Sequence, residues 1–192
     1  IISFNILDLP TFSDEERQSR LKEIAAYLRT IDPDVVCLQE AWNIQHRDLL
    51  HGALGADHYH RTNGSLRRTL FFMHLDTTGG LVIFSKFPIL KSRFVPFGRF
   101  LNAAVPEFFS RKGFLDVVLQ SPRGPLRVVN THLHQPAYFG DAFVRRKQFA
   151  RILAHLDASD EALPTVVAGD FNEHHIALHE DFIEPLRVAR LA

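Results

Sequence analysis

The sequence contains little cysteine and no long apolar run, and both shortages restrict what kind of protein it can be. Cys37 is the single cysteine, so neither an internal disulfide nor a zinc site built from cysteines can form. No apolar segment approaches the roughly 20 residues that a membrane-spanning helix needs, so we expect a soluble chain. The N-terminus also lacks a signal-peptide pattern, which leaves open whether the protein is secreted or cytoplasmic.

The sequence has no excess of charge of either sign. Lysine and arginine together number 22, as do aspartate and glutamate, so no overall positive field would attract nucleic acid. A local basic groove is still compatible with this balance. The length of 192 residues and the ordinary apolar content suit one globular domain, and we expect residues 1–192 to form it.

Short apolar runs predict strands, and two amphipathic patterns predict helices. Ser13 and Glu16 have the spacing of a capping box, and the apolar stripe that follows them ends before Pro33. A second helix is predicted from about Asp141 to a point before Pro164. The predicted strands cover residues 1–7, 34–39, 81–85, 114–119, 126–133 and 165–168.

The order of these elements predicts an α/β fold. Helices alternate with strands near both ends, whereas residues 81–133 contain strand patterns separated by proline and glycine, which is typical of an antiparallel meander. We expect two mixed or antiparallel sheets packed face to face with helices outside. A doubly wound parallel sheet is the alternative.

Polar side chains lie at or near the ends of four of the predicted strands: Asn5, Glu40, His132, and the pair Asp170 and Asn172. Ligands of α/β folds collect beyond the carboxyl ends of strands, so these side chains could form one site. Glu40 and Asn5 offer oxygen ligands of the kind that Mg²⁺ takes. His132 can donate to a phosphate oxygen, Asp170 can orient a base or a water, and Asn172 can bind a phosphoryl group. Each residue alone could be an ordinary surface or helix-capping residue. Their occurrence together indicates a site that binds a cation and a phosphate.

Six motifs occur in order along the chain: SFNIL, DPDVVCLQE, GGLVIFSKFPI, RKGF, NTHLH and VAGDFN. Together they resemble the magnesium-dependent endonuclease/exonuclease/phosphatase superfamily, whose deoxyribonuclease I-like fold is a four-layer α/β sandwich. The resemblance implies that Glu40 is the central Mg²⁺ ligand with Asn5 as its neighbour, and that Mn²⁺ can substitute. It also implies that His132 contacts the phosphate and that Asp170 and Asn172 line the scissile phosphate.

Within this superfamily the sequence resembles the neutral sphingomyelinases in particular. It shares their SKxPI, KGF and THL motifs and a helix with an R-x-x-Q pattern, here Arg145 and Gln148, before GDxN. The resemblance implies that these two residues and Lys112 bind substrate. A solvated helix face and an ordinary turn lysine are the alternatives. The implied function is a Mg²⁺-dependent phosphodiesterase that hydrolyses sphingomyelin or a related phospholipid by metal-assisted water attack, with a nuclease of the same fold as the alternative.

Five phenylalanines lie in a proline-punctuated stretch between SKFPI and RKGF: Phe94, Phe97, Phe100, Phe108 and Phe109. Some of them should belong to the core, because an aromatic ring buries a large apolar area. The others, if exposed, could insert into a lipid interface, as an enzyme that acts on membrane lipid requires. Residues 94–109 are therefore a candidate for peripheral membrane contact.

The superfamily pattern ends in a segment with an aspartate and a general-base histidine, and no such pair follows GDFN here. His174, His175 and His179 come too soon after that motif, at the start of a helix predicted for residues 176–189. We therefore expect the sequence to be incomplete at its C-terminus, and also at its N-terminus, where it opens inside a strand. The alternative is a non-catalytic domain that binds phosphate or lipid.

The 192-residue chain is predicted to bind Mg²⁺ and phosphate but to hydrolyse its substrate slowly. The rate should be about 10²- to 10⁴-fold below that of a superfamily enzyme that has the aspartate–histidine pair, because this is the usual cost of losing a general base. Vesicle turnover and calorimetric Mg²⁺ titration of the same sample measure the two properties. Full turnover would contradict both the expectation that the general base is missing and the alternative of a non-catalytic domain.

Overall fold

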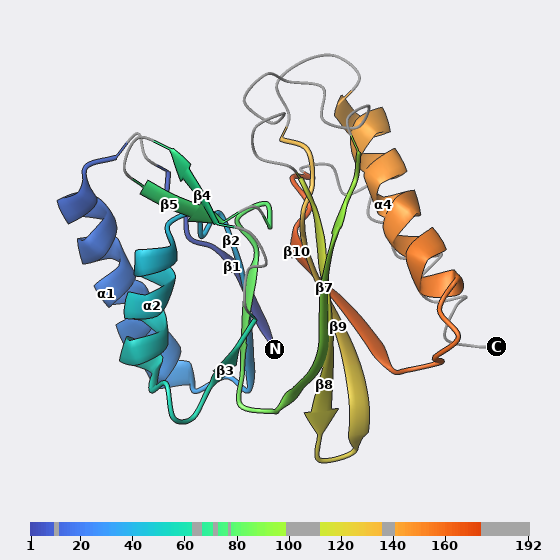
Figure 1. Ribbon diagram of the computed structural model, residues 1–192, viewed down its shortest axis with the longest axis horizontal. Coiled ribbons are helices and arrows are strands. Elements are labelled where there is room, and N and C mark those ends of the chain that lie inside the picture. The colour runs from blue at the N-terminus through green and yellow to red at the C-terminus, as the bar shows by residue number, and fades with distance from the viewer. Residues whose placement is uncertain are drawn as a thin grey trace.

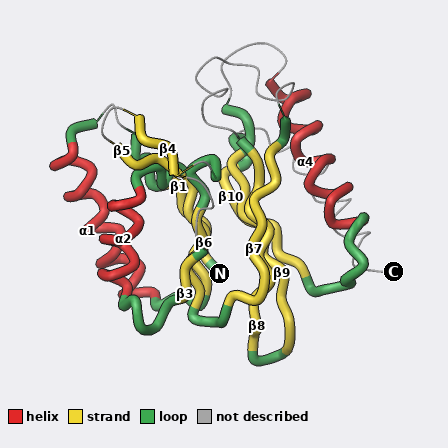
Figure 2. The backbone as a smooth tube through the Cα atoms, viewed as in Figure 1, coloured by secondary structure: helices red, strands yellow, loops and turns green. Residues whose placement is uncertain are grey.

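The computed structural model describes residues 1–9, 12–62, 67–70, 73–76, 78–98, 112–135 and 141–173, which build two sheets with helices on their outer faces (Figure 1, Figure 2). The first sheet contains, in spatial order, β1 (Ile2–Asn5), β2 (Val35–Gln39), β6 (Val82–Ser85) and β3 (His60–Arg61). The second contains β10 (Thr165–Asp170), β9 (Gly124–His132), β8 (Gly113–Ser121) and β7 (Ile89–Pro96). Helices α1 (Asp14–Ile31) and α2 (Ile44–Leu54) cover the first sheet and α4 (Asp141–Asp157) covers the second, while β4 (Arg67–Leu70) and β5 (Met73–Asp76) form a separate pair.

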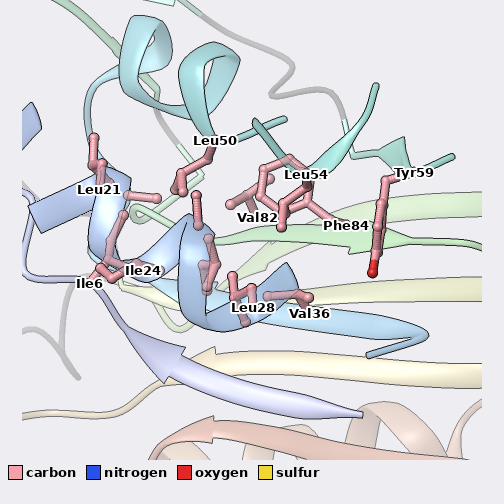
Figure 3. Packing of buried hydrophobic residues seen from close by; sticks show 13 residues of the cluster. Ile6, Leu21, Ile24, Leu28, Val36, Leu50, Leu54, Tyr59, Val82 and Phe84 are labelled. Carbon is pink, nitrogen blue, oxygen red and sulfur yellow. The ribbon is translucent and has the colours of Figure 1, made fainter. Parts of the chain in front are cut away.

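Three hydrophobic clusters hold the layers together. The cluster between the sheets contains Val35, Cys37, Leu81 and Ile83 from one side and Leu115, Val117, Leu119 and Val128 from the other. Figure 3 shows the cluster under α1 and α2, where Leu28 lies beside Val36 of the first sheet; Leu50 and Phe84 belong to the same cluster. Phe149 of α4 belongs to a third cluster on the outer face of the second sheet. The expected four-layer sandwich is confirmed, and the doubly wound alternative is wrong.

Both sheets are mixed. β1 pairs with β2 and β10 pairs with β9 in parallel, and the other pairs within the two sheets are antiparallel. The meander expected for residues 81–133 is only partly right, because β7, β8 and β9 form one but β6 belongs to the first sheet. The chain changes sheet in a turn where Ser85 Oγ accepts a hydrogen bond from the Phe87 N–H at 3.0 Å. Local apolar patterns do not show whether such a turn joins two neighbouring strands of one sheet or two strands that belong to different sheets.

The predicted capping box starts α1. Ser13 N–H donates to Glu16 Oε2 at 2.9 Å, and Glu16 N–H donates to Ser13 Oγ at 3.2 Å, so two otherwise unpaired backbone donors are satisfied. Asp32 ends the helix in a left-handed conformation, with φ 44°, directly before Pro33. The helix predicted from Asp141 is α4. The predicted helix at 176–189 lies outside the described residues.

The sequence pattern does not predict α2. Its buried face carries His46 and Arg47 beside Leu50, so the apolar period of a helix is interrupted. These polar side chains are buried because they have partners: His46 Nδ1 lies 2.8 Å from Asp8 Oδ1, and Arg47 Nε donates to the Ala41 carbonyl at 2.5 Å. The strands β3, β4 and β5 also have no clear signal in the sequence.

A buried polar bridge joins the two sheets. Gln39 Nε2 donates to Asn130 Oδ1 at 2.7 Å, and Asn130 Nδ2 donates to the carbonyls of Leu38 at 2.9 Å and Val82 at 3.1 Å. Both bridging side chains are fully buried. The bridge therefore links the end of β2 to the last residues of β9. The candidate functional residues lie at these two strand ends.

Two of the five phenylalanines between 94 and 109 lie in the core. Phe97 is buried under α4, and Phe94 packs on the cluster between the sheets. The expectation that some of them are core residues is confirmed. Phe100, Phe108 and Phe109 lie outside the described residues. Of the helices that the structure describes, none is long and apolar enough to cross a membrane.

Gly169 allows β10 to approach β9 closely. Its φ is +150°, and a Cβ atom there would lie 2.0 Å from the Thr131 carbonyl oxygen. We expect Gly169→Ala to lower the free energy of unfolding by about 1 to 3 kcal/mol, because the methyl group must displace backbone. Urea denaturation measures the change.

Gly52→Ala is the matched control for this prediction. Gly52 lies on the exposed side of α2, and a Cβ atom there would meet nothing within 4 Å. Alanine should raise the free energy of unfolding by about 0.5 to 1 kcal/mol, because it loses less backbone entropy on folding. Equal stability of Gly169→Ala and the parent protein would contradict the close approach.

Candidate active site

The structure gathers the five polar residues that follow the predicted strands. Asn5 Nδ2 donates to Glu40 Oε1 at 3.0 Å and to Asp170 Oδ2 at 2.9 Å. His132 Nε2 lies 3.9 Å from Glu40 Oε1 and 3.7 Å from Asp170 Oδ2. Asn172 donates its backbone N–H to Asp170 Oδ1 at 3.0 Å. The parallel pairs β1–β2 and β9–β10 end together, which brings residues distant in sequence into one cluster.

Glu40 occupies a left-handed turn at the end of β2, with φ 54°. Non-glycine residues rarely adopt this conformation, which costs on the order of 1 kcal/mol or more. The turn is held on both sides, because the Asp8 N–H donates to the Glu40 carbonyl at 3.1 Å and the Ala41 N–H donates to the Gly80 carbonyl at 2.9 Å. A side chain at Gly80 would meet the Trp42 ring at 3.0 Å, so the packing around this turn is tight.

The Glu40 carboxylate suits a bound cation. The residue is 8% exposed, and its Oε2 is buried with no hydrogen-bond partner among the described residues. A buried carboxylate oxygen without a donor is costly, and a cation removes that cost. Within the described part of the chain no group of three or more His, Cys, Asp or Glu residues could hold a metal. One or two carboxylates with neutral oxygens and water suffice for Mg²⁺, so the residues fit this ion.

Asn5 faces the two carboxylates with its amide nitrogen. Its Oδ1 accepts a hydrogen bond from the Leu7 N–H at 3.0 Å, while Nδ2 bridges Glu40 and Asp170. In this orientation the amide satisfies the carboxylates by hydrogen bonds. A role as an oxygen ligand therefore requires the Asn5 amide to rotate.

The cluster combines a neutral imidazole with an ionised carboxylate. Burial, together with the charge of Lys112, lowers the pKa of His132 from 6.5 to about 3, although Asp170 acts in the opposite direction. Burial raises the pKa of Asp170, but hydrogen bonds from Asn5 and the Asn172 N–H and the charge of Lys112 outweigh it and leave that pKa below its usual value. At neutral pH His132 thus offers one N–H donor and no charge.

Lys112 also lies in this cluster. It is buried, and its Nζ donates to the Leu133 carbonyl at 2.6 Å. Asn172 Nδ2 donates to the same carbonyl at 3.0 Å, and the Leu133 N–H donates to the Asp170 carbonyl at 2.9 Å. The alternative that Lys112 is an ordinary turn lysine is therefore wrong. Contact between Lys112 and a substrate stays a prediction.

Arg145 and Gln148 lie on the buried side of α4. Gln148 Oε1 accepts a hydrogen bond from the His134 N–H at 2.8 Å. Arg145 donates through Nε and Nη2 to Glu173 Oε2 at 3.2 and 3.1 Å. Both helix residues are buried, so the alternative of a solvated helix face is wrong. Their contact with a substrate stays a prediction.

The sequence did not indicate three contributors to this arrangement. Glu173 directly follows GDFN, but its ion pair with Arg145 spans 28 residues and has no local signal. The Leu133 carbonyl is a backbone group, which no residue pattern reveals. The buried bridge between Gln39 and Asn130 also had no signal, because both side chains lie in predicted strands and their pairing depends on how the sheets pack.

Comparison with known proteins finds a curated relative with clear sequence similarity to this chain. It is 31% identical to an inositol phosphosphingolipids phospholipase C of Schizosaccharomyces pombe over 194 residues, which covers 95% of this chain and 43% of the yeast protein. The chain therefore spans less than half the length of that relative.

Two solved structures extend the comparison. Sphingomyelinase C from Streptomyces griseocarneus superposes with a TM-score of 0.80 at 30% identity, covering 95% of this chain and 68% of that one. Beta toxin from Staphylococcus aureus with bound magnesium ions has the same fold, with a TM-score of 0.77, 19% identity and coverage of 96% and 68%. The sequence matches the Endonuclease/Exonuclease/phosphatase family over residues 2–179, and the chain belongs to this family.

Proposed function

We propose that the cluster at the strand ends is the active site of a Mg²⁺-dependent phosphodiesterase that acts on sphingomyelin or a related phospholipid. The main support is the convergence of Asn5, Glu40, His132 and Asp170 from four strands around a buried carboxylate oxygen that has no partner among the described residues. Two proteins similar to this chain are named for sphingolipids, one as a phospholipase C and one as a sphingomyelinase C. That similarity favours a phosphosphingolipid substrate.

Glu40 would hold Mg²⁺, with Asn5 beside it once its amide has rotated. When bound, the ion supplies positive charge to the phosphate oxygens, and Mn²⁺ could replace it. Asp170 remains ionised in this cluster, so it can orient a water molecule or a basic group near the phosphate.

The remaining residues would bind and orient the phosphate. Neutral His132 can donate its N–H to a phosphate oxygen, and Lys112 adds a positive charge next to it. Asn172 uses one N–H on the Leu133 carbonyl and has a second N–H for a phosphoryl oxygen. With a pKa of about 3, His132 is too weak a base to activate water at neutral pH. The family resemblance predicts that an aspartate–histidine pair has that role.

Glu40→Gln tests the metal assignment. Glutamine keeps an oxygen that can accept from Asn5 but removes the charge, so we expect Mg²⁺ affinity to fall at least about tenfold. Mg²⁺-dependent release of phosphocholine from sphingomyelin vesicles should fall on the order of 10²-fold or more. Calorimetry measures Mg²⁺ binding without any need for turnover. Glu23→Gln, at an exposed position on α1, is the matched control and should change neither property.

Three substrates separate the candidate functions. Vesicles with sphingomyelin, vesicles with an inositol phosphosphingolipid, and plasmid DNA are each incubated with the chain and Mg²⁺. Cleavage of plasmid with no action on either vesicle would indicate the nuclease. Binding of Mg²⁺ and inorganic phosphate without turnover of any substrate would indicate the non-catalytic domain. Unchanged Mg²⁺ affinity in Glu40→Gln would overturn the metal site.

A further inference from the structure

The peptide group between Leu133 and His134 connects the candidate site to α4. Its carbonyl oxygen accepts from Lys112 Nζ at 2.6 Å and from Asn172 Nδ2 at 3.0 Å. Its N–H, on the opposite edge of the same planar unit, donates to Gln148 Oε1 at 2.8 Å. Gln148 is 0% exposed, so this hydrogen bond is shielded from solvent. One backbone group therefore stands between Gln148 and two residues proposed to contact phosphate.

A hydrogen bond at one edge of a peptide fixes the direction of the other edge. The peptide is planar and its N–H and C=O point in opposite directions, so holding the His134 N–H also aims the Leu133 carbonyl. The bond to Gln148 also polarises the peptide and strengthens its carbonyl as an acceptor. Loss of the Gln148 acceptor would remove this hydrogen bond from the His134 N–H and release the carbonyl that holds Lys112 and Asn172.

Arg145 makes a similar connection to the other loop of the site. It lies one turn before Gln148 on the same helix face and donates twice to Glu173 Oε2, at 3.2 and 3.1 Å. The two side chains of this ion pair are 5% and 4% exposed. Glu173 directly follows Asn172, whose φ of 52° is left-handed. The buried pair therefore holds the backbone next to a strained residue of the site.

The position of α4 explains how one helix reaches both loops. The helix runs along the outside of the second sheet and begins at the end of the molecule where β10 finishes (Figure 1). Directly after Gln148 in the sequence, the Phe149 ring packs edge-on against Phe171 with the ring centroids 6.0 Å apart. Phe171 lies between Asp170 and Asn172 in the sequence, so this contact fixes the inner side of the same turn.

We propose that Gln148 and Arg145 are positioning residues of the candidate site. Gln148 acts through the Leu133–His134 peptide on Lys112 and Asn172, and Arg145 acts through Glu173 on the turn at Asn172. The inference rests on the proposed function and differs from the substrate-binding role that the family resemblance implies. Direct phosphate contact is the competing explanation for Arg145, because its buried Nη1 has no hydrogen-bond partner in the described part of the chain.

Two substitutions at Gln148 distinguish positioning from substrate contact. Gln148→Met removes the acceptor, so the side-chain amide resonances of Asn172 should shift and kcat should fall about 10- to 100-fold with little change in KM. Gln148→Glu keeps an acceptor oxygen and should recover most of both signals. If Gln148 contacted the phosphate, the added negative charge of Gln148→Glu would raise KM sharply. That result, or unchanged Asn172 resonances in Gln148→Met, would overturn the proposal.

A double-mutant cycle tests Arg145. Arg145→Met and Glu173→Met should each shift the Asn172 resonances and lower kcat, and the double variant should lose no more than the larger single loss. If Arg145 bound phosphate directly, Arg145→Met would lower kcat by the same factor in the Glu173→Met variant as in the parent protein. Additive losses would therefore overturn the role of the ion pair. Lys147→Met, on the exposed side of α4, is the matched control and should change neither measurement.

These measurements also separate the positioning role from the proposed function. The Asn172 side-chain resonances are recorded on the full chain without Mg²⁺ or substrate, so they report the loop geometry even if the chain turns over no lipid. Absence of turnover in the parent protein would count against the phosphodiesterase alone. Urea denaturation of each variant confirms that it folds before its spectrum is interpreted.

Discussion

A buried hydrogen bond between the two sheets, from Gln39 Nε2 to Asn130 Oδ1, sets the geometry on which the candidate site depends. Asn130 Nδ2 also donates to the Leu38 and Val82 carbonyls of the first sheet. The cluster around this bridge is apolar, and apolar contact has little directional preference. A buried amide pair does have direction, because any sliding of one sheet on the other leaves donors and acceptors unpaired. Glu40 follows Gln39 directly and His132 lies two residues after Asn130. The bond therefore fixes how far the carboxylate of one sheet stands from the imidazole of the other.

Backbone strain and buried charge both occur at this same edge. Glu40 and Asn172 both have left-handed backbones, and the cluster holds the buried side chains of Lys112 and His132 beside Asp170. Such features cost stability, and a fold keeps them only where the surroundings determine them fully. The apolar clusters on both sides of each sheet provide that support. The geometry of the candidate site therefore depends on the apolar packing on both faces of each sheet.

The sequence predicts those parts of the molecule whose signals are local. The capping box of Ser13 and Glu16 predicts where α1 starts, and apolar runs predict the strands whose ends carry Glu40 and His132. The prediction fails where a buried face is polar, as in α2, because His46 is buried by a hydrogen bond with Asp8 that no hydrophobic period reveals. The prediction also fails for β6, because the sheet to which this strand belongs depends on how the chain packs after the turn at Ser85.

The same distinction applies to the residues of the site. A polar side chain at a strand end can be found from sequence, because the chain itself places it at the edge of a sheet. The Leu133 carbonyl and Glu173 cannot be found in this way. The first is a backbone group, and the second matters only because α4 brings Arg145 against it from 28 residues away.

The strand ladders explain why an outer helix is needed at all. The register of β9 and β10 ends at the pair His132 and Asp170, and among the described residues only the backbone bond from the Leu133 N–H to the Asp170 carbonyl continues it. Beyond that point the ladder no longer fixes the backbone, yet Asn172 and the carbonyl that holds Lys112 lie there. A site needs its contact residues held rigidly, so another element must replace the lost ladder bonds. The buried face of α4 provides such bonds through Gln148 and Arg145, so this helix supports the backbone of the candidate site.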